Sequence, residues 1–227
     1  MGNLAVRSLS ALVLAPLVLV AEWYGGLYFD LLVALLMILS VHEWIQMCKN
    51  SEAGGSTTTR SVIRFVGILY ILAACFSLAW LRATHPDGAM LVLLMILAVW
   101  ASDTGAYFAG TMIGGPKLAP AISPKKTWSG LLGGSLAAGG VGAAMAHFGG
   151  ASQNIELLTG LGVMIGLFAA GGDLLESLVK RRFGVKDSGT LIPGHGGVLD
   201  RVDGLLAAAI GTAVASVNMG GHIELWP

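Results

Sequence analysis

Charged residues are scarce in this chain of 227 residues, at 11% of the sequence, against roughly 25% in an ordinary soluble domain. This scarcity argues against a soluble globule. The mean hydropathy of +0.77 and apolar runs long enough to cross a hydrocarbon core of about 30 Å predict a polytopic membrane protein instead. The length allows one membrane domain, so we expect residues 1–227 to form a single unit.

The chain also lacks an excess of either charge, with 13 basic and 13 acidic residues. These totals predict no nucleic-acid partner and no acidic tail. Cysteine is nearly absent as well. Cys48 and Cys75 lie within or at the end of apolar stretches, and their spacing fits neither a metal site nor a disulfide framework. We interpret both as packing residues.

Seven apolar runs have the length of transmembrane helices, about 17 to 25 residues each. They lie near 8–24, 27–47, 61–81, 89–109, 128–148, 156–178 and 205–221. The sequence therefore predicts an all-α transmembrane helix bundle of about seven spans. The fifth run is rich in glycine and alanine, which allow helix backbones to approach closely in lipid. We expect this run to be buried in the bundle.

The basic residues lie mainly on one side of this arrangement. Lys and Arg in short loops remain on the cytoplasmic face of a membrane, and a cytoplasmic N-terminus places only Arg82 on the outer side. We therefore expect the N-terminus inside and the C-terminus outside. Residues 1–100 would form a helical scaffold, and 101–227 a catalytic half with two cytoplasmic polar segments, 102–130 and 172–204.

The first polar segment begins with Asp103, an ionisable group at or inside the membrane boundary. Such a group usually faces a protein-lined cavity and marks a functional site, although an aspartate that reaches the interface from a helix end is the alternative. Hydroxyl and ammonium groups follow together, from Ser123, Lys125, Lys126 and Thr127. They suit a phosphate, or they anchor the inner end of the fifth span.

The second polar segment carries the stronger signal. Asp173, Glu176 and Lys180 are spaced so that a helix places them on one face. Gly171 and Gly172, directly before them, allow another backbone or a ligand to come close. The pattern predicts either a functional cluster at the membrane edge or a structural set of salt bridges.

More carboxylates and cations follow within a short stretch, at Lys186, Asp187, Asp200, Arg201 and Asp203. Asp200 and Asp203 lead into the seventh span at its N-terminal turn, where the backbone donors of a helix favour anions. Such a mixture suits a phosphate-rich substrate carried with Mg²⁺, which usually takes one or two carboxylates plus substrate phosphates. No cluster of His and Cys suggests zinc. His195 is either a loop residue or a group that binds phosphate or transfers protons.

These segments resemble the phosphatidate cytidylyltransferases, also called CDP-diacylglycerol synthases. The signature of that family is S-x-x-K-R-x-x-x-x-K-D-x-x-x-x-x-P-x-H-G-G-x-x-D-R-x-D. The chain matches it with Ser177, Lys180, Arg181, Lys186, Asp187, Pro193, His195, Gly196, Gly197, Asp200, Arg201 and Asp203. The SPKKTW and DTGAYFAG stretches and the pair Glu43-Trp44 also resemble the family. One departure is Ser129, where members often carry Glu, so we assign position 129 no catalytic role.

The resemblance implies the reaction of CTP with phosphatidate to give CDP-diacylglycerol and pyrophosphate. It implies Mg²⁺ as the cofactor, with either one metal ion or two in the site. It implies metal ligands at Asp173, Asp200 and Asp203, with Asp187 as an alternative to Asp203. The implied catalytic residues are Asp173, Lys180, Arg181, Lys186, Asp187, His195, Asp200, Arg201 and Asp203, and the implied substrate-binding residues are Asp103, Ser123, Lys125, Lys126, Thr127 and Ser177.

The resemblance also implies a multi-pass protein of a bacterial inner membrane, with its site facing the cytoplasm, and the glycine-rich spans are compatible with a homodimer. Two alternatives come from other activities. A transporter of organic phosphates would also use charges within the membrane, but the N-terminal half has no counterpart of the segment 173–203. A cytidylyltransferase for a different lipid phosphate is the closer alternative.

Overall fold

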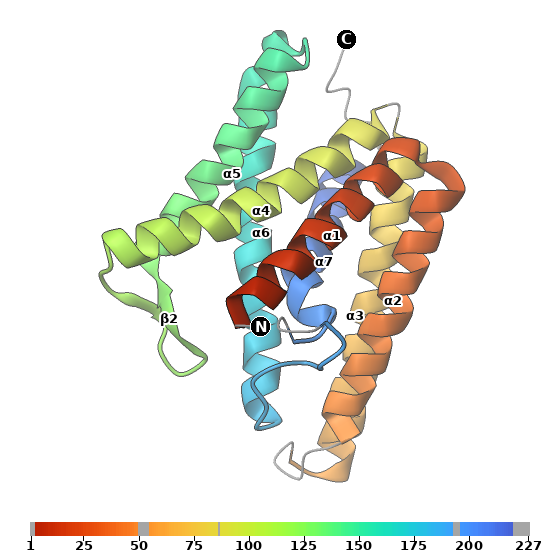
Figure 1. Cartoon of the computed structure of the whole chain (residues 1–227), viewed down its shortest axis with the longest axis vertical. Helices are drawn as coiled ribbons and strands as arrows, with labels where there is room; N and C mark the ends of the chain where they lie inside the picture. Colours follow the sequence, from red (N-terminus) through yellow and green to blue (C-terminus); the bar gives the residue numbers. More distant parts are fainter. Residues whose placement is uncertain (1–2, 50–54, 86, 193–195, 220–227) are drawn as a thin grey trace.

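The computed structural model describes residues 3–49, 55–85, 87–192 and 196–219, which form seven α-helices and a small two-stranded sheet (Figure 1). The helices are α1 (Asn3–Tyr24), α2 (Gly26–Lys49), α3 (Thr57–Thr84), α4 (Gly88–Met112), α5 (Trp128–Phe148), α6 (Ile155–Arg182) and α7 (Leu199–Asn218), with a short 3-10 helix η2 (Ser152–Asn154) before α6. Each predicted apolar run coincides with one of these helices. The all-α bundle is therefore confirmed.

Five helices, α2 to α6, are long and apolar enough to cross a membrane by length and composition. Among the described residues, α1 contributes only a shorter apolar helix, Leu12–Tyr24. Helix α7 begins with the charged residues Asp200, Arg201 and Asp203, which dilute its apolar character. The protein is thus a multi-pass membrane protein, and the count of seven spans stays a prediction for α1 and α7.

The helices pack as two antiparallel pairs joined by oblique crossings. Figure 1 shows α2 beside α3 and α5 beside α6, while α4 crosses the bundle at an angle and contacts both α5 and α6. Helix α7 packs against α3 and α6 and so joins the two pairs. Buried apolar side chains, including Ile71, Leu91, Met95 and Ile165, fill the interior.

Small residues allow α5 to lie directly against its neighbours. A Cβ atom added at Gly134 would lie 2.7 Å from the backbone carbonyl oxygen of Ser102 on α4, and one added at Gly142 would collide with the carbonyl of Leu158 on α6. Because real Cβ atoms do not approach backbone atoms so closely, these contacts require glycine. The prediction that the fifth run is buried by close helix packing is confirmed at these positions.

Replacing Gly142 with Ala will lower the thermal stability of the protein, because the added methyl group must push α5 away from α6. Overpacking of this kind typically costs about 1–3 kcal/mol. Gly140 on the same helix is the matched control, because nothing lies within 4 Å of a Cβ atom built there. Gly140→Ala will leave the melting temperature in detergent unchanged or raise it, since Ala favours helix over Gly. Equal melting temperatures for the two variants would contradict close packing at Gly142.

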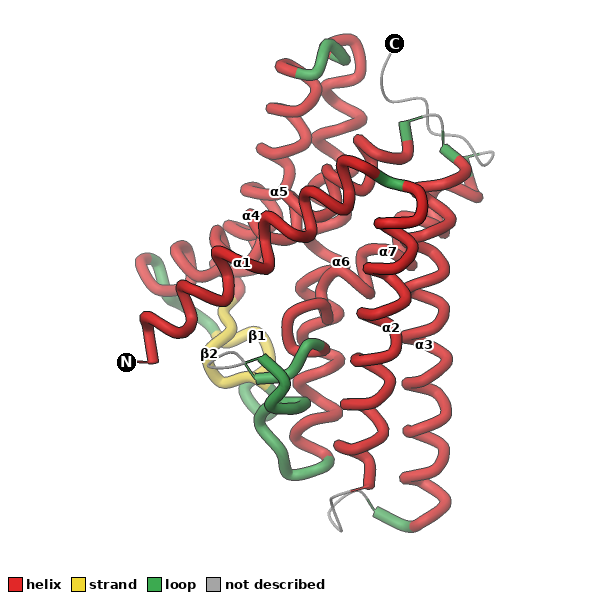
Figure 2. Tube along the Cα trace, turned by 45° about the vertical axis from the view of Figure 1, so that its right-hand side comes forward, coloured by secondary structure: helices red, strands yellow, loops and turns green. Residues whose placement is uncertain are grey.

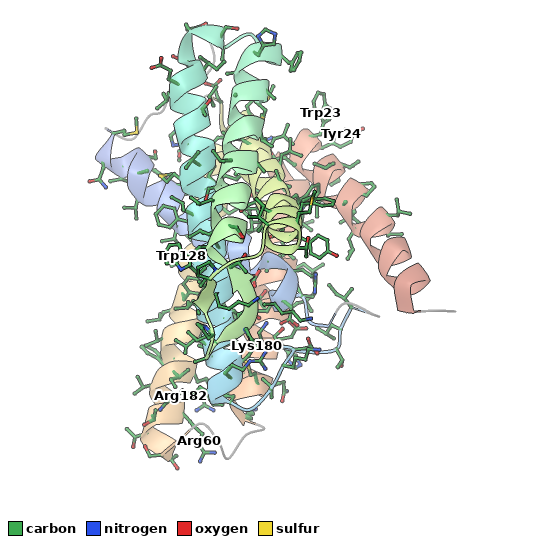
Figure 3. The ribbon with its side chains drawn as sticks, turned by 90° about the vertical axis from the view of Figure 1, so that its left-hand side faces the viewer. Trp23, Tyr24, Arg60, Trp128, Lys180 and Arg182 are labelled. Atoms are coloured by element: carbon green, nitrogen blue, oxygen red, sulfur yellow. The ribbon has the colours of Figure 1, made fainter. Side chains whose placement is uncertain are left out.

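The two ends of the bundle differ in charge. Figure 3 shows Trp23 toward one end and Arg60 and Arg182 toward the other. Arg82, the basic residue predicted to lie apart from the rest, pairs with Glu22 next to Trp23, with 3.0 Å between Arg82 Nε and Glu22 Oε1. The structure therefore separates Arg82 from the other two arginines.

The segment between α4 and α5 forms a hairpin that the sequence did not predict. Strands β1 (Lys117–Ala119) and β2 (Ser123–Thr127) pair antiparallel, and the backbone N–H of Trp128 donates to the carbonyl of Pro116 at 3.1 Å. Figure 2 shows this hairpin at the side of the bundle, close to the lower half of α6. The hairpin holds its polar side chains in a defined position rather than in a loose loop.

Candidate active site

The structure brings the two predicted polar segments together. Lys126, on β2 of the first segment, places its Nζ atom 2.6 Å from Oδ2 of Asp173, on α6 of the second. A further contact joins the tip of the hairpin to α6, because Arg181 Nε donates to the carbonyl of Ile122 at 3.3 Å. The association of these two segments is therefore a feature of the fold.

Asp173 lies at an accessible place between the hairpin and α6. Its side chain is 39% exposed, and that of Lys126 is 24% exposed. Ser177, one turn further along α6, donates from Oγ to Asp173 Oδ1 at 3.2 Å. The Lys126 Nζ atom itself is buried, so the pair is open to solvent mainly on the Asp173 side. The Asp173 carboxylate is thus accessible to a metal-bound ligand.

Lys180 forms a second and more deeply buried ionic group. Its Nζ atom lies 2.8 Å from Oδ1 of Asp200 and 3.4 Å from Oε1 of Glu176, and only 12% of the Lys180 side chain is exposed. Asp200 comes from the start of α7, whereas the other two residues lie on α6. The predicted face of α6 is therefore real, and it binds α7 at the same end of the bundle.

Asp200 is held by the backbone as well as by Lys180. Its Oδ2 atom accepts from the N–H of Ser188 at 2.9 Å and of Gly197 at 2.8 Å. Burial raises the pKa of this carboxyl, but the hydrogen bonds from Lys180, Gly197 and Ser188 and the charge of Lys180 outweigh it, so the net pKa is lowered. Asp200 is thus an ionised anchor that ties the segment before α7 to α6.

Glu43 holds the start of α7 next to the site, a role that the sequence did not predict. This α2 residue is only 2% exposed, and its carboxylate accepts from the backbone N–H of Val198 at 3.0 Å and of Leu199 at 2.9 Å and from Ser188 Oγ at 3.3 Å. The sequence marked it only as part of the resemblance. An acidic residue within an apolar run was the available signal, because burying an unpaired charge is costly.

The N-terminus of α7 is therefore already occupied by the chain's own carboxylates. We expected its backbone donors to favour anions, and Asp200 accepts from the N–H of Gly197 while Glu43 accepts from those of Val198 and Leu199. These are the groups that a bound phosphate would need. The anions at these three amides are thus carboxylates of the chain itself.

Further carboxylates lie around these two ionic pairs. Asp203 lies on α7 and Asp103 on α4, and the charges of both interact with that of Asp173. The Asp103 side chain is exposed, and the charge of Lys126 acts on it. Acidic groups from α4, α6 and α7 thus converge beside Lys126 and Lys180.

The other predicted site residues differ in exposure. Lys125, Arg181, Lys186, Asp187 and Arg201 are exposed, and Ser123 is half-buried. Thr127 is 3% exposed, and its hydroxyl accepts from the N–H of Gly130 at 3.0 Å, so it caps α5. His195 lies outside the described residues.

A mainly apolar cavity of about 400 Å³ adjoins the buried end of this cluster. Apolar side chains of α3, α6 and α7, among them Val66, Leu175 and Leu206, form most of its wall. Glu176 and Asp203 also line it, so the cavity ends at the acidic cluster. The charged groups and an apolar space therefore share one boundary.

The carboxylates predicted as metal ligands do not form a ready-made metal cage. Within the described part of the chain, no group of three or more His, Cys, Asp or Glu side chains is arranged to hold a metal ion. Asp200 is engaged by Lys180 and two backbone amides, and Asp173 by Lys126. This donor set suits an ion such as Mg²⁺ that takes few protein ligands and completes its shell with substrate phosphates and water.

Fold and site together define a class: a polytopic membrane protein that gathers lysines and carboxylates at one end of its bundle, next to an apolar cavity. Within that class, the chain belongs to the cytidylyltransferase family, whose sequence model matches residues 53–217. The matched range includes both polar segments.

Individual relatives cover almost the whole chain. The phosphatidate cytidylyltransferase of Brucella suis biovar 1 (strain 1330) is 35% identical over 248 aligned residues, with 92% of each chain covered. That of Rickettsia bellii (strain RML369-C) is 38% identical, covering 92% of this chain and 88% of the relative. That of Staphylococcus aureus (strain COL) is 46% identical over 123 residues, or 54% of this chain and 47% of the relative. The family resemblance is thus confirmed.

Proposed function

We propose that this protein is a phosphatidate cytidylyltransferase, which transfers CMP from CTP to phosphatidate and gives CDP-diacylglycerol and pyrophosphate. The observation that carries this conclusion is the shared boundary between an ionic cluster and an apolar cavity. A nucleotide from water and a phospholipid from the bilayer must meet at one place, and Lys126, Lys180 and the cavity provide both environments there.

In the reaction, a phosphate oxygen of phosphatidate attacks the α-phosphorus of CTP. A new P–O bond forms as the bond to the oxygen bridging the α- and β-phosphates breaks, and pyrophosphate leaves with that electron pair. The nucleophile is already anionic at neutral pH, so no strong general base is required. The ammonium groups of Lys125, Lys126 and Lys180 offset the repulsion between the two polyanions and hold them in line.

Asp173 and Asp203 are the residues that we propose to hold Mg²⁺, together with substrate phosphates, in one site or as part of a two-metal site. The ion would neutralise negative charge on the transferring and leaving phosphates. Asp200, the third predicted ligand, acts in this proposal mainly through Lys180, with which it is paired at 2.8 Å. Arg181, Lys186 and the other exposed cations of the segment would contact the phosphates of CTP.

The apolar cavity would receive an acyl chain of phosphatidate. Val62 and Val66 on α3 line it and are exposed on the apolar surface of the bundle, so a chain can enter from the bilayer. At its inner end lies Glu176, whose Oε1 is 3.4 Å from Lys180 Nζ. A lipid seated here places its phosphate beside Lys180, where the reaction requires it.

A Val66→Trp variant will raise the KM for phosphatidate, because the indole narrows the entrance of the cavity. We expect an increase of about tenfold, corresponding to about 1.4 kcal/mol of lost binding. The KM for CTP will stay unchanged. Leu69→Trp is the matched control, since Leu69 is also an exposed α3 residue but does not line the cavity. An unchanged phosphatidate KM in Val66→Trp would place the acyl chain elsewhere.

We further propose that the protein lies in a bacterial inner membrane with this site facing the cytoplasm, as the positive-inside rule predicts for the end that carries Arg60 and Arg182. Single cysteines at Lys125 and Ser152, at the two ends of α5, test this topology in a background lacking Cys48 and Cys75. A membrane-impermeant maleimide should label the Ser152→Cys variant in intact cells, and the Lys125→Cys variant only after lysis. The reverse pattern would contradict the orientation.

The reaction itself is tested with detergent-purified protein, phosphatidate, CTP and Mg²⁺. We expect CDP-diacylglycerol and pyrophosphate in equal amounts. Conversion of a different lipid phosphate, with none of phosphatidate, would show that the acceptor is wrong. Uptake of an organic phosphate into proteoliposomes without consumption of CTP would instead favour a transporter.

A further inference from the structure

Glu43 and Asp200 bind the same short segment from opposite sides. Both carboxylates accept hydrogen bonds from Ser188, Glu43 from the hydroxyl and Asp200 from the backbone N–H. Both also bind the start of α7, where Asp200 takes the N–H of Gly197 and Glu43 takes the next two. Together they hold the described parts of the segment that leads from α6 to α7, residues 188–192 and 196–199.

The space around the Glu43 carboxylate shows a close fit. A Cβ atom added at Gly189 would lie 2.5 Å from Glu43 Oε1, and one added at Gly197 would lie 2.5 Å from Glu43 Oε2. Neither glycine can carry a side chain without displacing the carboxylate. The segment is thus shaped around Glu43, which enters from α2 in the N-terminal half of the chain.

We infer that Glu43 is a positioning residue for catalysis, and this inference rests on the proposed function. Glu43 acts indirectly. Its hydrogen bonds hold Ser188 and the start of α7, and these in turn place Asp200. Asp200 then orients Lys180, whose Nζ atom lies 2.8 Å from Asp200 Oδ1. Glu43 itself touches neither the cavity nor the Lys126–Asp173 pair. The N-terminal half, expected to be only a scaffold, therefore contributes a residue that supports the active site.

The negative charge of Glu43 matters as well as its size. All three of its hydrogen-bond partners act as donors, two of them at the positive end of the α7 dipole. The glutamine of Glu43→Gln has the same shape, but an NH₂ group replaces one of the two accepting oxygens. That NH₂ group would then face a donor, and neither group could accept the other's hydrogen. One end of the segment would lose its partner while the side chain still fills the space.

The test compares Glu43→Gln with Ser40→Ala, a matched control one turn earlier on α2. Ser40 is fully buried, and its Oγ has no hydrogen-bond partner in the described residues, so its loss breaks no bond. Loss of a residue that orients a catalytic group typically lowers activity about 10- to 100-fold. We expect a fall of this size in kcat per folded Glu43→Gln molecule, with the KM for phosphatidate within about twofold of the parent. Ser40→Ala should match the parent.

Hydrogen exchange provides a readout that does not depend on turnover. In Glu43→Gln, the amides of Ser188, Val198 and Leu199 should exchange about tenfold faster or more, while those of α4 and α5 stay protected. Unchanged exchange would overturn the inference, even if the parent protein proved to have another substrate. Faster exchange with full kcat per folded molecule would also overturn it, because Glu43 would then be structural only. A parent that consumes no CTP would refute the proposed function, and exchange would still decide whether Glu43 holds the segment.

Discussion

An Asp173→Asn variant will lose about a thousandfold in kcat and will still fold like the parent. The loss follows from removing a carboxylate that we propose to bind Mg²⁺ where charge develops in the transition state. The fold survives because the Asp173 side chain is 39% exposed and its partner Lys126 24% exposed. The amide oxygen of Asn can still accept from Lys126, so the buried Nζ atom keeps a partner.

Three measurements on purified protein separate the causes of this loss. Initial rates at saturating CTP and phosphatidate give kcat, a Mg²⁺ titration gives the half-saturating concentration, and the melting temperature reports the fold. We expect kcat to fall, the Mg²⁺ requirement to rise and the melting temperature to stay the same. Asp30→Asn is the control, since Asp30 is an exposed aspartate near the start of α2, away from the site, and its variant should keep full activity. Full activity in Asp173→Asn would remove this residue from the site.

The helices could be predicted because the bilayer imposes a simple rule on the sequence. A span must satisfy its own backbone and present apolar side chains over about 20 residues, so each run of that length marks a helix. The convergence of Asp173 and Lys180 could also be predicted, because spacing along α6 places them near the same end of the bundle. Both predictions depend only on residues close together in the chain.

The missed features depend on residues far apart in the chain or on very short elements. Glu43 binds Ser188, 145 positions away, and Leu199, 156 positions away, and no local pattern records such a pairing. Strand β1 has only three residues, which is too short for the alternation that identifies a strand. The hydroxyl of Thr127 caps α5, a role that the sequence TWSG also allows, and substrate binding by Thr127 stays a prediction.

Asp200→Asn is expected to differ from Asp173→Asn by losing stability and activity together. Only 6% of the Asp200 side chain and 12% of the Lys180 side chain are exposed. Removing one partner of a buried ion pair leaves the other charge uncompensated, at a typical cost of about 3–5 kcal/mol. The Asn NH₂ group would also face the Lys180 ammonium or the N–H of Ser188 and Gly197. Lys180 then loses its orientation, and kcat falls with it.

Urea unfolding of the two aspartate variants and their parent at several pH values tests this difference. The folded-state pKa of Asp200 lies below its ordinary value, so its ionised form stabilises the parent above about pH 4 and this contribution is lost as the pH falls further. The stability gap between the parent and Asp200→Asn should therefore be largest near neutral pH and narrow in acid. Asp187→Asn, an exposed site in the same segment, should be as stable as the parent at every pH. A gap for Asp200→Asn that does not change with pH would mean that the loss comes from shape, and that the ionised carboxylate is not what holds Lys180.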